Sequence, residues 1–397
     1  MEAVRRSRPG RFFPITVCLL LGALLGCTNA GDGLRGRAEN GTETARTPEP
    51  DRDRALDRLL EPSESAAEAG VDGRPDRVGD GGEAATFGAE DPSASPFLFS
   101  SDRSGVFQVY LRRGDEVTPL TDDPTMDSVW PRLSPDGTMV MMIRSPVEAR
   151  PAFGSVDTNH GAASLWTMRF DGSGAEQQIP ATTFDQLGPA NWSPDGLEVV
   201  FAATDPLDGR FRLWIADADR FAARPITSRD GLLLDPAFGP DGRRLAYAAY
   251  PAGHRGGADD FERLEVFVAN ADGSQETRLT FDELQDQRPS WSKDGEVIVF
   301  ETAVDPDYLF VGKWDLRSVS PAGGAVTTVL ADGNVNSGGR WHRSEAGLFF
   351  QRFVFGGEGR RLAYIDSDGS GLTTFGSDDA PYDDINIDPV PVALGGP

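Results

Sequence analysis

Short runs of β-branched, aromatic and alternating apolar residues, separated by turns rich in Gly, Pro and Asp, make up the chain from about residue 94 onward. One turn sequence, Ser-Pro-Asp-Gly or a variant of it, recurs at residues 134–137, 193–196, 239–242 and 292–295, with a degenerate copy at 344–347. A β-type run follows each copy, at residues 138–143, 197–201, 243–247, 296–300 and 347–350. Asp-Gly between two such runs is a strong hairpin signal, because Gly accepts the positive φ that a tight turn demands.

A second turn separates two further runs in each unit. It carries Asp-Gly at residues 171–172, 272–273 and 368–369, with an apolar run before it and a Thr-rich run after it. Each unit therefore contains four strands joined by hairpins, which makes its sheet antiparallel. Antiparallel four-stranded units that recur every 40–60 residues or so are typical of β-propeller blades. The predicted fold class is all-β.

The number of blades expected from the repeats is six. Six Thr-rich fourth strands can be counted, but the runs at residues 97–99 and 106–111 have no first strand before them. The run Ile385–Asp388 near the C-terminus could supply the missing strand. A strand added there would close the ring and remove its open sheet edges. We therefore expect residues 94–397 to form a six-bladed propeller of four-stranded antiparallel blades, closed by a C-terminal strand.

The length of the repeat varies at one place. The distance from an Asp-Gly turn to the next Ser-Pro-Asp-Gly turn is nearly constant, whereas the connection between the second and third strands carries insertions, notably at residues 146–163, 250–263 and 302–313. In an antiparallel blade these connections open on the same face of the ring. Because variable loops on a rigid scaffold commonly bind ligands, we expect this loop-bearing face to bind a partner.

The repeated motif, typified by Trp192–Gly196 and Trp291–Gly295, resembles that of the TolB-like β-propeller family. The resemblance extends over essentially all of residues 94–397 and implies the propeller fold. The sequence differs from this family in two respects. Proteins of the TolB type carry a folded α/β domain before the propeller and are soluble, whereas the residues before this propeller are too polar for such a domain and carry a lipidation motif. The resemblance therefore implies the fold and not membership of a Tol–Pal system.

Composition restricts the partners. The chain has 63 acidic residues against 38 basic ones, which gives a formal net charge of −25. Nucleic acids bind clustered Lys and Arg, so we expect no nucleic-acid partner. Two cysteines allow one disulfide at most and exclude a four-cysteine zinc site.

The N-terminus has the form of a bacterial export signal. Four arginines among residues 1–11 precede an apolar run over residues 12–26, which is too short to span a membrane as a mature helix. The run ends in Leu24-Leu25-Gly26-Cys27, which resembles the lipobox of bacterial lipoproteins. We predict that residues 1–27 are a lipoprotein signal peptide and that Cys27 is the lipidation site. An ordinary cleaved signal and a membrane anchor are the alternatives.

The position after Cys27 suggests which membrane holds the anchor. Thr28 stands where an inner-membrane retention signal would often place Asp, which favours the outer membrane, facing the periplasm. Several acyl chains on one cysteine would make this N-terminal lipid anchor stable. Residues 28–93 are acidic, with Phe87 as their one aromatic residue, and cannot bury enough apolar surface to fold. We interpret them as a disordered linker.

Common catalytic motifs are missing from the sequence. It contains no Gly-x-Ser-x-Gly, no His-Glu-x-x-His and no Gly-rich phosphate loop. The Ser and Asp residues of the repeated turn are expected to stabilise that turn. The three histidines, His160, His254 and His342, are expected to be exposed or hydrogen-bonded rather than metal ligands. We therefore predict no catalytic residue.

An acid or an amide stands at the entry to each first strand, and first strands line the central channel of a propeller. The six residues are Asp127, Gln186, Asp235, Asp286, Asn336 and Asp384. They can be interpreted as a hydrated channel mouth that caps strand ends, or as a binding site. Several hard oxygens that converge on a channel suit calcium, which is the one cofactor that the sequence suggests.

Three classes of function remain open. The first is an envelope-tethered lipoprotein whose propeller binds an envelope protein or peptide through the loop-bearing face. The second is a calcium-dependent propeller hydrolase. The third is a binder of cell-wall carbohydrate, for which Phe153, Tyr250 and Tyr308 in the long loops could stack on sugar rings.

Overall fold

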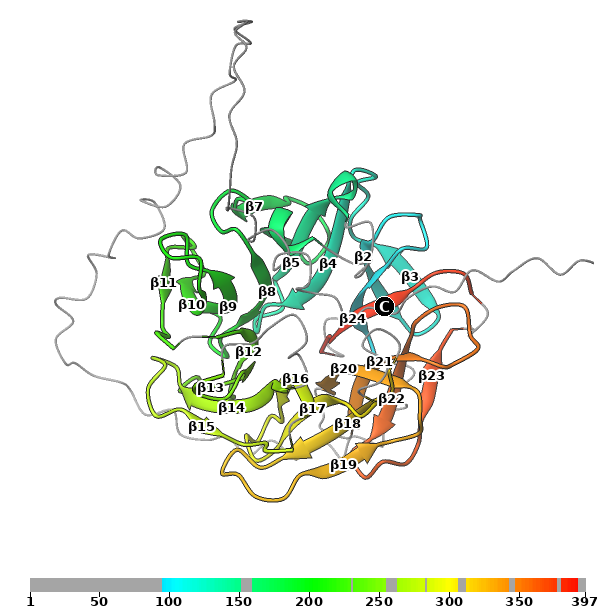
Figure 1. Ribbon diagram of the computed structural model, residues 1–397. Helices are drawn as coiled ribbons and strands as arrows, with labels where there is room; N and C mark the ends of the chain where they lie inside the picture. Colours follow the sequence, from blue (N-terminus) through cyan, green and yellow to red (C-terminus); the bar gives the residue numbers. More distant parts are fainter. Residues whose placement is uncertain are drawn as a thin grey trace, which may run out of the picture.

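The computed structural model describes residues 95–150, 159–229, 231–254, 263–282, 284–305, 312–342, 347–376 and 380–391. Regular structure in these ranges is almost entirely β-strand, with two short 3-10 helices, η3 (Val147–Ala149) and η4 (His160–Ala162). The sheets are arranged around a central axis (Figure 1). The predicted all-β propeller architecture is confirmed.

Four of the sheets contain four antiparallel strands each. One follows the chain outward from the axis as β4 (Met126–Leu133), β5 (Met139–Pro146), β6 (Ser164–Arg169) and β7 (Glu176–Ile179). The next consists of β8 (Leu187–Trp192), β9 (Glu198–Thr204), β10 (Phe211–Asp217) and β11 (Ala223–Pro225). A third consists of β12 (Leu233–Phe238), β13 (Arg244–Ala249), β14 (Glu265–Asn270) and β15 (Thr277–Arg278).

The fourth of these sheets joins the two ends of the described chain. Its strand order is β24-β1-β2-β3, with bounds β24 (Asp384–Pro389), β1 (Phe97–Ser101), β2 (Gln108–Arg113) and β3 (Glu116–Pro119). Strand β24 pairs with β1 in antiparallel fashion, from Phe97 opposite Pro389 to Ser101 opposite Asp384. This pairing confirms the predicted closing strand.

The remaining strands form one sheet of eight, and the prediction of six separate blades is wrong in this respect. The sheet contains β16 (Gln285–Trp291), β17 (Ile298–Ala303), β18 (Trp314–Val319), β19 (Thr327–Leu330), β20 (Val335–Trp341), β21 (Gly347–Phe353), β22 (Arg361–Asp366) and β23 (Thr373–Phe375). One parallel pair, Trp314 with Val335, links β18 to β20. The Trp314 backbone N–H donates to the Asn334 carbonyl oxygen over 3.0 Å, and this contact merges the strands expected in two blades.

The repeated turns fold as the sequence predicts. In Ser292–Gly295, Ser292 Oγ donates to Asp294 Oδ1 over 2.6 Å, and the same carboxylate accepts the Glu296 backbone N–H over 3.0 Å. Gly295 has a φ of 75°, in the region that favours glycine. The same Ser–Asp hydrogen bond recurs at residues 134–136 and 193–195. These side chains therefore hold the turns, as expected.

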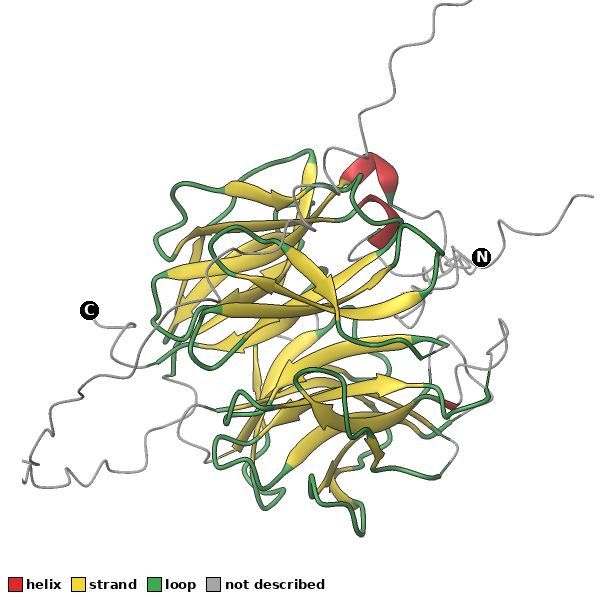
Figure 2. Ribbon diagram, turned by 90° about the vertical axis from the view of Figure 1, so that its left-hand side faces the viewer, coloured by secondary structure: helices red, strands yellow, loops and turns green. Residues whose placement is uncertain are grey.

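The apolar core lies between successive sheets. In one layer, Val200 and Leu213 of the β8–β11 sheet pack with Leu245, Tyr247 and Phe267 of the next sheet. Each sheet buries both faces in this way, and the ring has two different ends. We call the end formed by the Ser-Pro-Asp-Gly-type turns the turn face, and the end formed by connections between second and third strands the loop face. Both 3-10 helices lie on the loop face, at the right of Figure 2.

Candidate functional site

Each innermost strand departs from regular pairing at one place. The register with its neighbour shifts at residues 130–131, 188–189, 235–236, 288–289, 338–339 and 386–387. The second residue of this β-bulge is proline in four strands, and proline has no N–H to donate to a sheet. The first residue has a positive φ in five strands: Trp130, Asp235, Arg288, Gly338 and Asn386. Because a bulge redirects side chains, these residues come to line an axial channel.

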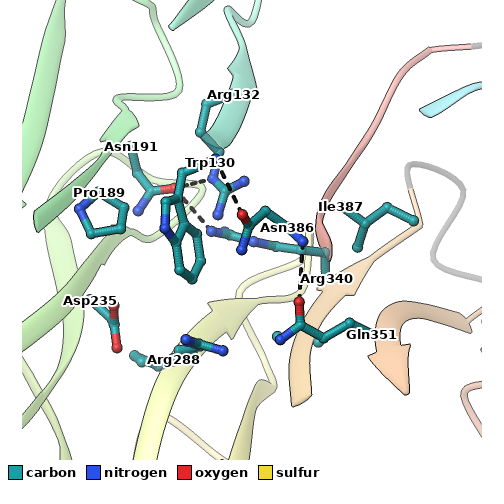
Figure 3. Close-up of a pocket in the computed structure, with 13 residues that line it drawn as sticks. Trp130, Arg132, Pro189, Asn191, Asp235, Arg288, Arg340, Gln351, Asn386 and Ile387 are labelled. Atoms are coloured by element: carbon teal, nitrogen blue, oxygen red, sulfur yellow. Dashed lines mark hydrogen bonds between the residues drawn. The ribbon is translucent and has the colours of Figure 1, made fainter. Parts of the chain in front are cut away.

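Two arginines occupy the same part of the channel wall (Figure 3). Arg132 donates from Nε to Asn191 Oδ1 over 3.0 Å and from Nη1 to the Pro131 carbonyl oxygen over 2.7 Å. Arg340 donates from Nη2 to the same Asn191 oxygen over 3.2 Å. Asn191 is held in turn by a 2.8 Å hydrogen bond from Nδ2 to the Pro236 carbonyl oxygen. One amide therefore positions two guanidinium groups beside each other.

Burial lowers the pKa of both guanidinium groups. Arg132 is only 4% exposed, and desolvation, followed by the charge of Arg340, lowers the pKa of Arg132 to about 9. Desolvation also lowers the pKa of Arg340, while the charges of Asp388 and Asp235 oppose this effect. The direction of both shifts shows that the lost hydration of these cations is incompletely replaced by nearby carboxylates.

A third arginine completes the wall. The Arg288 guanidinium lies 4.7 Å from the centre of the Trp130 ring, and its Nη1 is 3.5 Å from Oε1 of the buried Glu301. Trp130 Nε1 and Arg288 Nε are buried and have no hydrogen-bond partner among the described residues. Buried donors in proteins are normally satisfied. The channel wall therefore has unused hydrogen-bonding capacity.

A wider pocket of about 1110 Å³, open solvent at its mouth included, lies at the turn face. Aromatic side chains at the ends of the inner strands form much of its wall, namely Phe238, Trp291 and Trp341. Lys293 of the repeated turn stands in the wall as well. Arg340 lines both this pocket and the channel, so the two lie next to each other.

Comparison with known proteins points to one group. The chain is 32% identical over 137 residues to the Tol-Pal system protein TolB of Anaeromyxobacter dehalogenans and 30% identical over 158 residues to a TolB homolog of Chlorobium luteolum. Among solved structures, TolB from Acinetobacter baumannii matches 74% of this chain and 66% of its own length, with a TM-score of 0.55 and 13% identity. The chain is therefore similar to TolB in sequence over part of its length and in its β-propeller fold.

The sequence similarity to these relatives covers only part of each chain. The matched stretches cover 34% and 39% of this chain and only 28% and 31% of the two relatives. A chain of a nidogen–laminin complex is also similar, over 74% of this chain and 98% of its own, with a TM-score of 0.53 and 11% identity, which reflects the fold alone. No protein-family profile matches the chain.

Of the six polar residues expected at the channel mouth, only Asp235 lines the channel of the TolB-like propeller. Gln186 lies just before β8, is half-buried, and donates its backbone N–H to Thr204 Oγ1 over 2.9 Å. The other four are buried and do not form a hydrated rim: Asp127, Asp286, Asn336 and Asp384.

The reason for this difference is local geometry. These residues precede the bulge, so their side chains point between the sheets. Asp127 accepts the Phe107 backbone N–H over 3.0 Å and forms an ion pair with Arg150. Asp384 Oδ1 lies 2.7 Å from Arg103 Nη2. Sequence reasoning missed Arg132, Arg288 and Arg340. The proline that marks the bulge in four of the six inner strands is a visible signal for Arg132 and Arg288, whereas Arg340 follows a glycine.

Asp286 belongs to a group of acids at the edge of the β14–β16 region. Oxygens of Glu265, Asp282 and Asp286 lie within 4.8 Å of one another, the one such group among the described residues. Burial raises the pKa of Asp286 to about 7, although a hydrogen bond from Thr302 opposes the shift. Arg278 Nη2 is 2.5 Å from Glu265 Oε1 and already neutralises part of the group.

Calcium finds no support in the channel of the TolB-like propeller. Three arginines line it, and a calcium ion there would face their positive charges.

Two of the three histidines contact oxygen atoms of the protein. His160 Nδ1 lies 2.8 Å from the Leu187 carbonyl oxygen, and His342 Nε2 lies 2.9 Å from Ser95 Oγ. No helix of the described residues is long and apolar enough to cross a membrane.

Proposed function

We propose that this TolB-like propeller is a protein-binding scaffold of the bacterial cell envelope, and that it receives an extended segment of a protein partner at the turn face. The observation that carries the proposal is an open pocket at the turn face, with three aromatic residues in its wall, next to a channel whose wall contains unsatisfied buried donors. Aromatic walls with a few convergent polar groups are typical of sites that recognise ligands and protein segments. The name of the first relative, a Tol-Pal system protein, supports an envelope setting.

The proposed site lies on the turn face. The sequence analysis instead expects a partner at the opposite, loop face, because the insertions lie there. The middle parts of those insertions, together with Phe153 and Tyr308, lie outside the described residues. In this proposal the eight-stranded sheet contributes two inner strands, β16 and β20, to the channel wall.

A matched pair of charge reversals tests the binding site. Lys293 is exposed in the wall of the turn-face pocket, and Lys313 is exposed on the loop face, just before β18. We expect Lys293→Glu to reduce the protein captured from envelope extract by about tenfold, because reversed charge at an interface repels a partner selected for the opposite sign. Lys313→Glu should leave capture unchanged.

The measurement is quantitative mass spectrometry of proteins bound to the immobilised full-length chain. Both variants should melt at the parental temperature, because both lysines are exposed. Loss of capture in Lys313→Glu alone would place binding on the loop face and overturn the proposed site. A specifically bound saccharide in place of a protein would favour the carbohydrate alternative.

We also propose that the propeller is tethered by lipid. In this proposal residues 1–27 are the signal peptide, Cys27 is acylated in the outer membrane, and residues 28–93 link the anchor to a propeller in the periplasm. The support is the sequence around Cys27 and the acidic, aromatic-poor composition of the linker, and these residues lie outside the described part of the chain.

Changing the cysteine tests the tether. We expect Cys27→Ser to abolish incorporation of a palmitate analogue and to release the chain from membranes or leave its precursor uncleaved. Cys18→Ser, a change inside the apolar run, is the matched control and should keep the label. Equal labelling of the parent and Cys27→Ser would refute lipidation at this residue.

A further inference from the structure

Two guanidinium groups lie together in the channel wall with no carboxylate between them. Arg132 and Arg340 both donate to Asn191 Oδ1, over 3.0 and 3.2 Å. Among the described residues, neither has a carboxylate oxygen within 4.0 Å. Two like charges that share one neutral oxygen repel each other, and burial removes the water that would screen them.

The acids nearby do not replace the missing partner. Asp388 and Asp235 attract Arg132 and Arg340 only from beyond ion-pair distance. Asp388 Oδ2 is already engaged, since it accepts the Leu133 backbone N–H over 2.8 Å. Buried charges in proteins are normally paired directly. The arrangement therefore leaves a position for an anion next to the two arginines.

Two further donors belong to the same wall. Trp130 is 5% exposed, and its Nε1 has no partner among the described residues. Arg288 Nε, on the side chain stacked over the Trp130 ring, is unpartnered in the same sense. Figure 3 shows Trp130 between Arg132 and Arg288, and all three line the channel. All of these groups can only donate hydrogen bonds, so the position selects an acceptor.

We propose that this position binds a carboxylate group of a protein segment that enters from the turn face, held by Arg132 and Arg340 with Trp130 Nε1 as an additional donor. Guanidinium groups bind carboxylates in a fork geometry that orients both groups. A phosphate offers similar oxygens, but its second negative charge would be repelled by Asp235 and Asp388. The inference deepens the proposed function and rests on it for the source of the carboxylate.

Sodium acetate is the probe, added to the isotopically labelled full chain and followed through the Trp130 indole N–H resonance. Trp130→Phe identifies that resonance, and sodium chloride at equal ionic strength is the reference. We expect a saturable shift with acetate that chloride does not produce. Arg132→Gln should raise the half-saturating concentration at least about tenfold, as expected when a charge-assisted hydrogen bond is lost.

Two variants keep the test decisive. Arg144→Gln is the control, because Arg144 also stacks on an indole, Trp166, at 4.7 Å, but pairs with Asp123; it should leave acetate binding unchanged. If Arg132→Gln does not fold, Arg340→Gln must show the same weakening. A shift that does not saturate, or equal saturation in the parent and the folded arginine variant, would overturn the carboxylate site, as would tighter saturation by phosphate.

The source of the carboxylate is resolved with two peptides of matched sequence. One has a free C-terminus and no acidic residue, and the other has an amidated C-terminus and one central Glu. The peptide that binds more tightly identifies the source. Acetate binding without loss of capture in Lys293→Glu would support the carboxylate site and contradict the proposed entry from the turn face. Loss of capture in Lys293→Glu without saturable acetate binding would support entry from the turn face and contradict the carboxylate site.

Discussion

Removal of the closing strand is expected to abolish cooperative folding. A chain that ends after Tyr382 lacks β24, all six residues of which are buried. Burial of Ile385, Ile387 and Val390 alone contributes roughly 5–9 kcal/mol, at about 1.5–3 kcal/mol for each side chain. This is comparable to the whole stability of a typical domain, about 5–15 kcal/mol. The deletion also leaves the β1 edge unpaired, which favours aggregation.

Thermal unfolding followed by circular dichroism measures this effect. The truncated chain should show no cooperative transition near that of the parent, or should precipitate. Removal of residues 392–397 alone, which follow the closing strand, is the control and should preserve the transition. A truncated chain that melts like the parent would show that β24 does not close the ring.

The second large effect is a change in pH dependence caused by Asp286→Asn. The folded-state pKa of Asp286, about 7, lies above its ordinary value of 3.8, because burial penalises the charged form. The folded protein therefore holds a proton that the unfolded chain releases. The stabilisation linked to Asp286 is fully present below about pH 4 and is lost as the pH rises through 7. Since one pKa unit corresponds to about 1.4 kcal/mol, the loss amounts to about 4 kcal/mol.

The variant should not suffer this loss, because the asparagine side chain is neutral at every pH. Its amide can also donate to the acids nearby, Glu265 and Asp282. Denaturant unfolding between pH 4 and pH 8, in EDTA, should show the free energy of unfolding of the variant rising relative to the parent by up to about 4 kcal/mol. Asp115→Asn, at a fully exposed acid, is the control. Parallel pH profiles for the parent and Asp286→Asn would contradict the assignment.

Much of the fold can be predicted from the sequence, because turns and hairpins are local. The positive φ required in Ser292–Gly295 fixes glycine at the end of the motif, and the run after it becomes β17, Ile298–Ala303. The closing strand could be predicted at residues 385–388 because the N-terminal strands lack an inner neighbour. The eight-stranded sheet could not be predicted, because it depends on one parallel contact, between Trp314 and Val335, that no residue pattern specifies.

The candidate site was harder to predict, because a bulge breaks the two-residue period of a strand. Before the bulge, Asp127 and Asp286 point between sheets, although regular alternation would allow either face. Beyond it, Arg132 and Arg340 reach the channel. The proline at the second bulge position, as in Arg288-Pro289, indicates where the reversal occurs. The channel wall is positively charged because arginines stand at or after the bulge, although the chain as a whole is negatively charged.

The central claim, that a partner binds at the turn face, can be tested most directly by cross-linking. The chain contains two lysines, Lys293 in the wall of the turn-face pocket and Lys313 on the loop face. Both are exposed, so an amine-reactive reagent samples the two faces separately. Mass spectrometry of the full-length protein cross-linked in intact cell envelopes should yield partner peptides joined to Lys293. Partner peptides joined to Lys313, with Lys293 modified but unlinked, would contradict the account.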